Sequence, residues 1–508
     1  MRKKTQQRTD YYLKFIKTNA NVYLKEYLTK DDRYWKTVGE EMALKLFSEM
    51  SDRVPAYKHF LEKHKINPKQ VKTIADFKKV PVIDKENYIN KYPLNELCWE
   101  GKVEDSYLLS ASSGSTGIPN FWPRSTEQTY QGALISELIY KNFFQMDKKN
   151  TLYIVAFAMG TWIAGTYMMM STEWVAQKRY PITVVTPGTN KEEILRLIRL
   201  GAKNYEQIIL IGYPPFVKDV IDTGKTEGIN WEKINIRFMF SGEAITEKWR
   251  TYLQKSTNIK NILTDTINIY GSADVGLIAH ETVVTTYIRK KSVENEKIRN
   301  ALFEAERIPA VYQFDPRLRY FERYEGHLLI SARSGIPLCR YDTKDIGNIL
   351  YFGEVEHLLG KSGIEITKDL ISLNLRSLLW KLPLVYLFGR GKFTAIIYGA
   401  NIYPEHVKLV LEHDELEALL TGKFLISTEE KADNSQILNL RIELRDKVNA
   451  TKELKNRVKN LFITEISNVN SEYKNNLSFL KNKVHPIIFL HKYGDQKYFP
   501  RGIVKKHA

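Results

Sequence analysis

The stretch EQIILIGYPPFVKDVIDTGKTEGINWEKINIRFMFSG, residues 206–242, decides the fold class. It holds an apolar run, EQIILIGY (206–213), a helical pattern, PPFVKDVIDTG (214–224), and a second apolar run, INIRFMFSG (234–242). Short apolar runs rich in β-branched and aromatic residues are typical of buried strands, and a helix between two of them is typical of a βαβ unit. The stretch therefore predicts neighbouring parallel strands joined by a helix.

The same alternation continues on both sides of this unit. Further strands are predicted for TLYIVAFA (151–158), PITVVT (181–186) and TINIYG (266–271), and a helix for KEEILRLIRLGA (191–202). Strands that alternate with helices predict an α/β fold, with a sheet covered by helices on both faces. Ligands of such sheets bind beyond the carboxyl ends of the strands, so the segments that follow the strands are the candidate site.

The sequence changes character near Gly389. A glycine-punctuated segment is followed by an alternating strand, LNLRIELRD (438–446), and a helix, KELKNRVKNLFITEI (452–466). We therefore predict a large domain over residues 1–389 and a small, mobile α+β domain over residues 390–508. Residues 1–50 are predicted to form a helical N-terminal extension of the large domain.

Composition excludes several classes of protein. The 508 residues are 43% hydrophobic and 27% charged, which excludes a disordered or low-complexity chain. The two cysteines, Cys98 and Cys339, exclude a disulfide scaffold and a cysteine-built zinc site. The Lys/Arg-rich start lacks the apolar core of a signal peptide, so we expect a cytoplasmic protein.

The net charge of +17 favours anionic partners. It fits either a general compositional bias or a functional basic surface, and both stay open. No nucleic-acid-binding signature is recognisable, so no nucleic-acid partner is expected. The cations concentrate in residues 481–508, which hold Lys481, Lys483, Lys492, Lys497, Arg501, Lys505 and Lys506.

Residues 151–172 contain no charge and are long enough to resemble a membrane span. However, Gly160 and Gly165 interrupt the stretch, and its first part is rich in β-branched and aromatic residues. We interpret it as a buried strand, a glycine turn and a buried helix rather than as a transmembrane helix.

Four segments at or after predicted strands carry residues suited to a nucleotide. SSGSTGIPN (112–120) is a loop of glycines and hydroxyls that could wrap donors around phosphates, although it is not a Walker loop. NIYGSADVG (268–276) brings Asp274 to a strand end, where it could hold Mg²⁺. CRYDTKDIG (339–347) contains Asp345, a possible acceptor for ribose hydroxyls. GRGKFTAIIYGANIYP (389–404) places Arg390 at the predicted domain junction. Taken singly, the first three segments fit an ordinary turn better than a binding site, and Arg390 fits a solvated linker equally well.

In their order and spacing, these segments resemble the motifs of the adenylate-forming ligases, and most closely the branch of the phenylacetate–CoA ligases. FSGEAIT (240–246) resembles the adenine-side segment of that branch, and GHLLISARSGIPLCRYDTKDIG (326–347) resembles its run into the ribose aspartate. VPAYKHF (54–60) and ADFKKVPVIDKENY (75–88) resemble its N-terminal pattern. The resemblance covers roughly residues 50–508.

The resemblance implies a ligase that uses ATP and Mg²⁺ to convert a carboxylic acid to an acyl-adenylate, with release of pyrophosphate. A thioester with CoA or with a phosphopantetheinyl carrier would follow, and an acidic carrier protein is one candidate for that carrier. An aryl or medium apolar acid is implied, and no zinc. The alternatives are an acyl-protein synthetase of the luminescence type and a non-catalytic basic binding protein.

The resemblance also assigns roles to individual residues. The phosphate loop would comprise Ser113, Gly114, Ser115, Thr116 and Gly117. The adenine would be bordered by Ser241, Gly242, Glu243, Tyr270 and Gly271, and the ribose would be held by Asp345 and Arg390. Asp274 would be a catalytic residue as the ligand of Mg²⁺, the catalytic lysine would be Lys505 or Lys506, and the hinge would be Lys392. The acid would be bound by Phe157, Met159, Trp162, Ile163, Gly212 and Gly276.

Some positions depart from the family pattern. Asp274 stands where the family usually has glutamate, and Asp342-Thr343-Lys344-Asp345 replaces the usual Arg-Thr-Gly-Asp. The segment 351–388 is longer than expected, and residues 1–40 look additional. His280 is isolated from other metal ligands in the sequence and is expected to be a packed or surface histidine.

Overall fold

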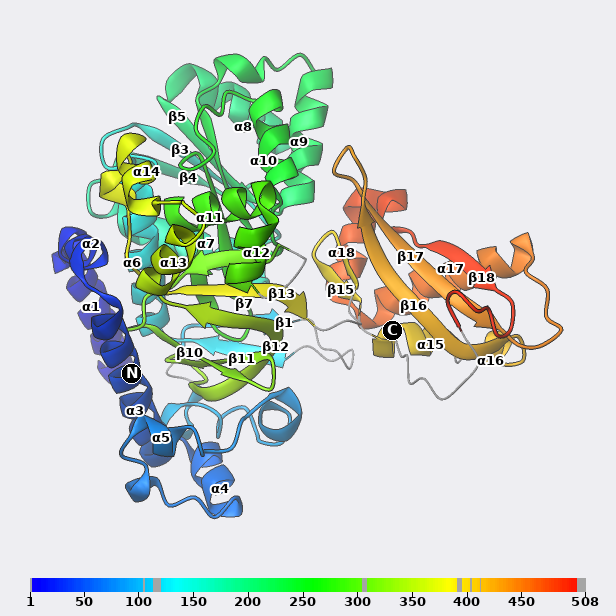
Figure 1. Ribbon diagram of the computed structural model, residues 1–508, viewed down its shortest axis with the longest axis horizontal. Coiled ribbons are helices and arrows are strands. Elements are labelled where there is room, and N and C mark those ends of the chain that lie inside the picture. The colour runs from blue at the N-terminus through cyan, green and yellow to red at the C-terminus, as the bar shows by residue number, and fades with distance from the viewer. Residues whose placement is uncertain are drawn as a thin grey trace. The chain divides into compact units, whose positions relative to one another are not determined.

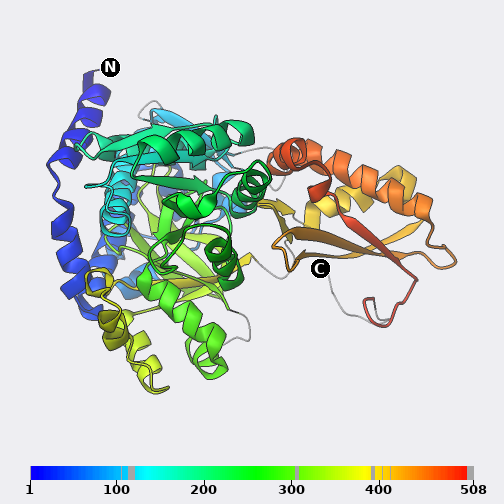
Figure 2. The same ribbon diagram turned by 90° about the horizontal axis from the view of Figure 1, so that it is seen from above.

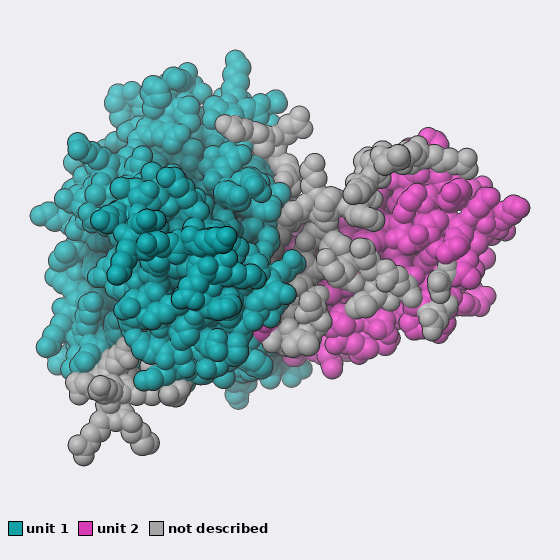
Figure 3. All heavy atoms as spheres, turned by 90° about the horizontal axis from the view of Figure 1, so that it is seen from below, with its two compact units in different colours: residues 1–111, 121–389 teal, residues 112–120, 390–508 magenta. Residues whose placement is uncertain are grey.

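The computed structural model describes residues 2–103, 106–112, 120–303, 308–390, 395–402, 404–411 and 413–499. The chain divides into two compact units, coloured separately in Figure 3. The first unit comprises residues 1–111 and 121–389, and the second comprises residues 112–120 and 390–508.

The first unit is built on a sheet of eleven described strands, each hydrogen-bonded to its neighbours. In spatial order these are β10 (Arg319–Tyr324), β11 (His327–Ala332), β12 (Leu338–Leu350), β13 (Leu384–Arg390), β9 (Ala310–Gln313), β8 (Gly276–His280), β7 (Thr266–Ser272), β6 (Ile236–Ser241), β5 (Gln207–Gly212), β3 (Thr151–Ala156) and β4 (Ile182–Val185). Strands β4, β3, β5, β6 and β7 run parallel to one another. From β7 to β8 and β9 the pairing is antiparallel.

Helices cover both faces of the parallel strands (Figure 1). The helices of this region are α6 (Thr126–Asn142), α7 (Ile163–Ala176), α8 (Lys191–Asn204), α9 (Pro214–Thr226), α10 (Glu247–Ser256), α11 (Val283–Glu294) and α12 (Glu296–Phe303). Alternate residues of β5 divide between the faces, because successive side chains of a strand point to opposite sides. Ile209 and Ile211 lie in the apolar cluster of α6, α7 and α11, whereas Ile208 and Leu210 lie in the cluster of α8, α9 and α10.

The N-terminal helices run along one side of the first unit (Figures 1 and 2). They are α1 (Arg2–Lys17), α2 (Ala20–Thr29), α3 (Asp32–Arg53), α4 (Pro55–Lys63) and α5 (Ile74–Phe77). The additional segment 351–388, with α13 (Phe352–Gly360) and α14 (Ile366–Ser372), packs against them. Tyr27 and Trp380 have ring centroids 5.1 Å apart, and the Gly353 N–H donates to the Asp32 carboxylate at 3.0 Å. The two insertions therefore stabilise each other.

A separate two-stranded ribbon, β1 (Leu108–Ser112) and β2 (Asn120–Arg124), flanks the predicted phosphate loop. The loop residues 113–119 themselves lie outside the described residues. The Ala111 N–H donates to the Thr161 carbonyl at 2.9 Å, so β1 is attached to the chain that precedes α7. The predicted loop therefore connects two paired strands, since β1 ends at Ser112 and β2 begins at Asn120.

The second unit contains two small sheets and several helices. One sheet pairs β14 (Ala395–Ile397) with β15 (Ala400–Ile402), and the other has the order β16 (Leu420–Glu430), β17 (Gln436–Leu444) and β18 (Ile487–His491). Its helices are α15 (Pro404–Leu411), α16 (Asp414–Glu417), α17 (Lys452–Val469) and α18 (Ser471–Leu480). Val458, Phe462 and Ile466 recur every three or four residues on α17 and are buried, which is the pattern of a helix packed on a sheet.

The predicted α/β fold class is confirmed. The uncharged stretch 151–172 forms strand β3 and most of helix α7, as expected of a strand, a turn and a buried helix. None of the helices in the described part of the chain has both the length and the apolar character needed to cross a membrane.

Candidate functional site

Three parallel strands, β5, β6 and β7, end at the same edge of the large sheet. Ser241, the last residue of β6, lies opposite Ile269 of β7, and its Oγ donates to the Ile269 carbonyl at 3.1 Å. Gly242 follows with φ +101°, a backbone conformation that glycine adopts without strain. The chain therefore turns beside Ile269, the residue that precedes Tyr270 in β7.

Glu243 is held at this edge by two neighbouring strands. Its Oε2 accepts a hydrogen bond from the Tyr213 hydroxyl at 2.6 Å, and Tyr213 directly follows β5. Its backbone carbonyl accepts from Nδ2 of Asn268, in β7, at 2.8 Å. The segment after β6 is thus fixed from both sides, and three of the predicted adenine-side residues, Ser241, Gly242 and Glu243, meet there.

Tyr270 joins this edge to β12. Its hydroxyl donates to Oδ2 of Asp345 at 2.5 Å, and its ring stacks on Tyr312 with centroids 5.6 Å apart. Burial raises the pKa of Tyr312, so its hydroxyl stays protonated. Asp345 is itself buried. The predicted adenine-side tyrosine and the predicted ribose aspartate are therefore in direct contact, although they are 75 positions apart in sequence.

Asp274 lies in the turn between β7 and β8, and its side chain is only 6% exposed. One carboxylate oxygen, Oδ1, is 3.3 Å from the ammonium nitrogen of Lys85, and the other, Oδ2, accepts from the Tyr341 hydroxyl at 2.7 Å. Arg124 donates a hydrogen bond to the carbonyl of Ala273 and so fixes the turn between β7 and β8. The carboxylate therefore has a defined position and is held by residues from distant parts of the chain.

Asp274 could supply one carboxylate to a magnesium ion, provided that the Lys85 ammonium moves away from Oδ1. No group of three or more His, Cys, Asp or Glu side chains in the described ranges could hold a metal. Mg²⁺ commonly takes one or two carboxylates from the protein and completes its shell with phosphate oxygens and water. A single carboxylate at the strand end suits this arrangement.

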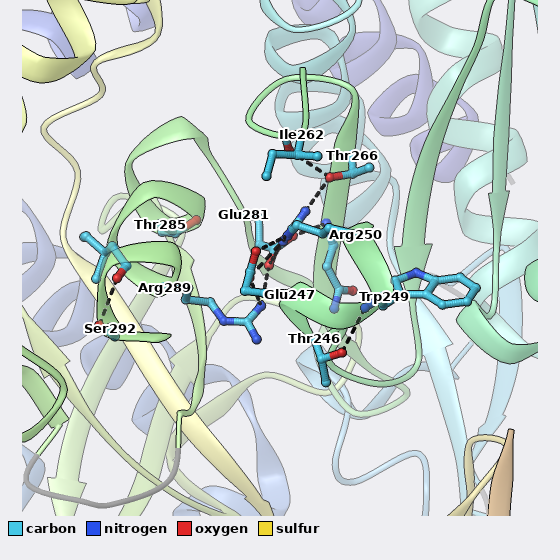
Figure 4. Close-up of polar contacts among 12 residues, drawn as sticks. Thr246, Glu247, Trp249, Arg250, Ile262, Thr266, Glu281, Thr285, Arg289 and Ser292 are labelled. Carbon is cyan, nitrogen blue, oxygen red and sulfur yellow. Dashed lines mark hydrogen bonds and ion pairs between the residues drawn. The ribbon is translucent and has the colours of Figure 1, made fainter. Parts of the chain in front are cut away.

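A buried network of charged side chains is hydrogen-bonded to β7 (Figure 4). Oε1 of Glu281 accepts from Arg250 at 2.6 Å and from Arg289 at 3.2 Å, and Oε2 accepts from the backbone N–H of Asn268 at 2.8 Å. Burial alone would lower the pKa of Arg250, but Glu281 and Glu247 more than offset this and raise it. Arg250 therefore stays charged, and the network fixes the strand that carries Tyr270.

We expect Glu281→Gln to lower the free energy of unfolding by roughly 3 kcal/mol, because it leaves two buried guanidinium groups short of a counter-charge. Urea denaturation measures the change. The matched control is Glu294→Gln. Glu294 is the last residue of α11 and pairs with Lys291 at the surface, at 3.2 Å. The control is expected to change stability by at most about 0.5 kcal/mol. Equal, small effects of both variants would contradict the structural role given to Glu281.

The residues predicted to bind the acid lie around α7. Phe157 is buried in the apolar cluster of α6 and α7, against which Ile163 packs. Met159 lies against Gly165, where a Cβ would come within 2.7 Å of its sulfur. Trp162 pairs with Ala111 just before α7 begins.

The two glycines predicted for the acid pocket have different surroundings. Gly276 has φ +90°, and a Cβ there would lie 3.8 Å from the Tyr167 ring. Gly212 ends β5, where a Cβ would meet Val217 at 2.8 Å. The acid-pocket assignment itself remains a prediction for all six residues.

Several predicted site residues cannot be placed. Arg390 ends strand β13, but its side chain is not described. The others lie outside the described residues: Ser113, Gly114, Ser115, Thr116, Gly117, Lys392, Lys505 and Lys506. Their roles stay predictions from the sequence.

The structure adds residues that the sequence did not single out: Lys85, Tyr213, Asn268, Tyr312 and Tyr341. Tyr213 and Asn268 carried a usable signal, because Tyr213 directly follows β5 and Asn268 begins the quoted segment 268–276. Lys85 carried a partial signal, because it lies in ADFKKVPVIDKENY, the segment that resembles the N-terminal pattern. Its pairing with Asp274, 189 positions later (274 minus 85), could not be predicted from the sequence.

His280 is a packed histidine, as expected. It is buried, which lowers its pKa to about 4, and its ring lies edge-on to Trp380 with centroids 5.7 Å apart. Its Nδ1 is 2.8 Å from the carbonyl of Glu281. Both contacts give the imidazole a structural role in the core.

Sequence comparison relates this chain to known ligases. It is 19% identical to a phenylacetate–coenzyme A ligase of Thermus thermophilus over 380 residues, which cover 74% of this chain and 75% of that protein. It is 20% identical to a phenylacetate–coenzyme A ligase of Aromatoleum evansii over 411 residues, which cover 78% of this chain and 79% of that protein. No protein-family model matches the sequence.

Solved structures share the fold. A 2-hydroxyisobutyryl-CoA ligase in complex with 2-HIB-AMP and CoA, in the thioesterification state, superposes with a TM-score of 0.63 at 14% identity, covering 95% of this chain and 91% of that chain. The same ligase in the postadenylation state gives a TM-score of 0.53 at 13% identity, covering 93% of this chain and 89% of that one. The predicted resemblance to the adenylate-forming ligases is confirmed by these comparisons.

Proposed function

We propose that this chain, which has the fold of acid–CoA ligases that form an acyl-adenylate, activates a carboxylic acid with ATP. The acid oxygen attacks the α-phosphorus, pyrophosphate leaves, and a thiol then attacks the acyl carbon and releases AMP. The observation that carries the proposal is the meeting of Ser241, Glu243, Tyr270 and Asp345 at one edge of the sheet. Sheets with helices on both faces bind their ligands at this edge, beyond the carboxyl ends of the strands.

The nucleoside would be bound by residues whose positions are already fixed. Asp345 accepts a hydrogen bond from Tyr270, and a carboxylate has enough acceptor positions to bind the ribose hydroxyls as well. Asn268 Oδ1 is a buried acceptor without a hydrogen-bond partner among the described residues. A donor such as the adenine amino group would satisfy it, and Tyr270 would lie against the base.

The triphosphate would be bound by the loop that β1 and β2 flank. We propose that Ser113, Ser115, Thr116 and the backbone N–H groups of Gly114 and Gly117 hold the β- and γ-phosphates. When bound at Asp274, Mg²⁺ would neutralise phosphate charge that builds up as pyrophosphate leaves. Arg390 would reach the ribose or phosphate, and Lys505 or Lys506 would bring a cation to the α-phosphate. Lys392 would be the hinge.

The acid would be bound near the start of α7. Phe157, Met159, Trp162 and Ile163 offer aromatic and apolar surface, which suits an aryl or medium apolar acid. Gly212 and Gly276 would leave room opposite them. The acceptor is CoA or the phosphopantetheine of an acidic carrier protein, and a reaction supplied with ATP and CoA fits the cytoplasm.

Acid-dependent exchange of labelled pyrophosphate into ATP tests this function. A panel of aryl and alkyl acids should include some that support exchange well above the acid-free rate, and the same acids should yield thioester when CoA is added. A panel in which no acid raises the exchange rate, with Mg²⁺ present, would contradict the proposal.

A further inference from the structure

A lysine lies beside the carboxylate that is predicted to hold the metal. The Lys85 ammonium is 3.3 Å from Oδ1 of Asp274, and the exposed fractions of the two side chains are 26% and 6%. A carboxylate buried to this extent requires a compensating positive charge or hydrogen bonds. Lys85 provides the charge and the Tyr341 hydroxyl provides a hydrogen bond.

The backbone around Lys85 is attached to β12. Ile83 pairs with Tyr341, with its N–H donating to the Arg340 carbonyl at 3.2 Å and its carbonyl accepting from the Asp342 N–H at 2.9 Å. This places Lys85 two residues after Ile83, the residue that pairs with Tyr341 of β12. The two partners of Asp274 therefore come from adjacent, hydrogen-bonded segments.

A second ion-pair cluster fixes the residue before Lys85. Lys344 Nζ is 2.9 Å from Asp84 and 2.9 Å from Asp342. The Asp84 carboxylate also caps the short helical turn Lys85–Ile89 by accepting from the N–H groups of Glu86 and Asn87. We call Asp84, Asp342 and Lys344 the β12 clamp.

The β12 clamp fixes the position of Lys85 relative to β12. Lys344 has φ +60°, a backbone conformation that is uncommon for residues other than glycine. The clamp that Lys344 and Asp342 form holds Asp84, and the next residue, Lys85, pairs with Asp274.

We propose that Lys85 is a resident cation at the predicted metal position: it neutralises Asp274 until a divalent metal displaces its ammonium. The proposal deepens the proposed function and rests on it for the identity of the metal ligand. An ammonium and a divalent ion cannot share one carboxylate oxygen without strong repulsion, so the metal can bind only when Lys85 moves away. The phosphates that arrive with the metal would then be the anions nearest to Lys85.

The test is a titration of the full chain with Mn²⁺ in the absence of nucleotide and acid, with free Mn²⁺ measured by electron paramagnetic resonance. Mn²⁺ replaces Mg²⁺ because it prefers the same oxygen ligands. We expect Lys85→Met to bind Mn²⁺ at least about tenfold more tightly than the unchanged chain, because the competing charge is gone. Lys85→Arg, the matched control, keeps the charge and should bind as weakly as the unchanged chain. Lys85→Met combined with Asp274→Asn should lose the gain.

A folded Lys85→Met variant that binds Mn²⁺ no more tightly than the unchanged chain would overturn the proposal, as would a gain that persists in the double variant. If Lys85→Met does not fold, Lys344→Met decides, because it loosens the β12 clamp and should give a smaller gain. Unchanged affinity in that variant would also overturn the proposal. Because no ATP or acid is present, the result is independent of whether pyrophosphate exchange is observed.

Discussion

Replacing Asp345 by asparagine is expected to lower kcat/KM for ATP in the exchange reaction about 100-fold. The substitution keeps the shape of the side chain but replaces a carboxylate that would accept charge-assisted hydrogen bonds from the ribose hydroxyls. Two weakened bonds of this kind correspond to roughly 3 kcal/mol. Steady-state exchange at varied ATP concentration measures the effect, which should appear with every acid that supports turnover.

The matched control is Asp369→Asn. Asp369 also accepts a hydrogen bond from a tyrosine, Tyr287, but it lies on α14, on an element that we assign no role in the reaction. It should leave kcat/KM for ATP nearly unchanged. A comparable loss in both variants, or none in Asp345→Asn, would remove Asp345 from the nucleotide site.

Replacing Lys505 by alanine is expected to slow acyl-adenylate formation about 100- to 1,000-fold, because a cation at the α-phosphate stabilises charge that develops in the first step. Lys506→Ala should have a much smaller effect if Lys505 is the catalytic residue, and the reverse pattern would assign the role to Lys506. Thioester formation from a supplied acyl-adenylate should stay close to normal in both variants. Single-turnover measurements of the two steps separate these effects.

Lys497→Ala controls for the general loss of basic charge from the C-terminal segment. Lys497 lies over the ring of Tyr498, with its Nζ 5.1 Å from the ring centroid. It should leave both steps nearly unchanged. An active parent that loses nothing on replacement of either Lys505 or Lys506 would contradict the catalytic assignment.

Much of the fold could be predicted from the sequence, because strand and helix periods are local properties of the chain. The apolar runs at 206–213 and 234–242 became β5 and β6, and PPFVKDVIDTG became the greater part of α9. The packing of 351–388 against the N-terminal helices could not be predicted, because it depends on pairs such as Tyr27 and Trp380 that share no sequence pattern.

The candidate site was predictable only in part. The rule that ligands bind at strand ends led to Asp274, and the resemblance of the ordered motifs led to Ser241, Tyr270 and Asp345. The contact between Tyr270 and Asp345 could not be predicted from the sequence. It depends on the order of the strands in the sheet, in which β13, β9 and β8 lie between β12 and β7. Lys85 was missed for the same reason: its position depends on the pairing of Ile83 with Tyr341.

The most direct test of the central claim follows an isotope through the reaction. An acid that supports exchange is labelled with ¹⁸O in its carboxylate and converted to the thioester with ATP and CoA, and the AMP is analysed by mass spectrometry. Attack of the acid oxygen on the α-phosphorus predicts one ¹⁸O atom in each AMP, because that oxygen stays with phosphorus when the thiol attacks the acyl carbon. AMP without the label, or label found in inorganic phosphate, would contradict the account.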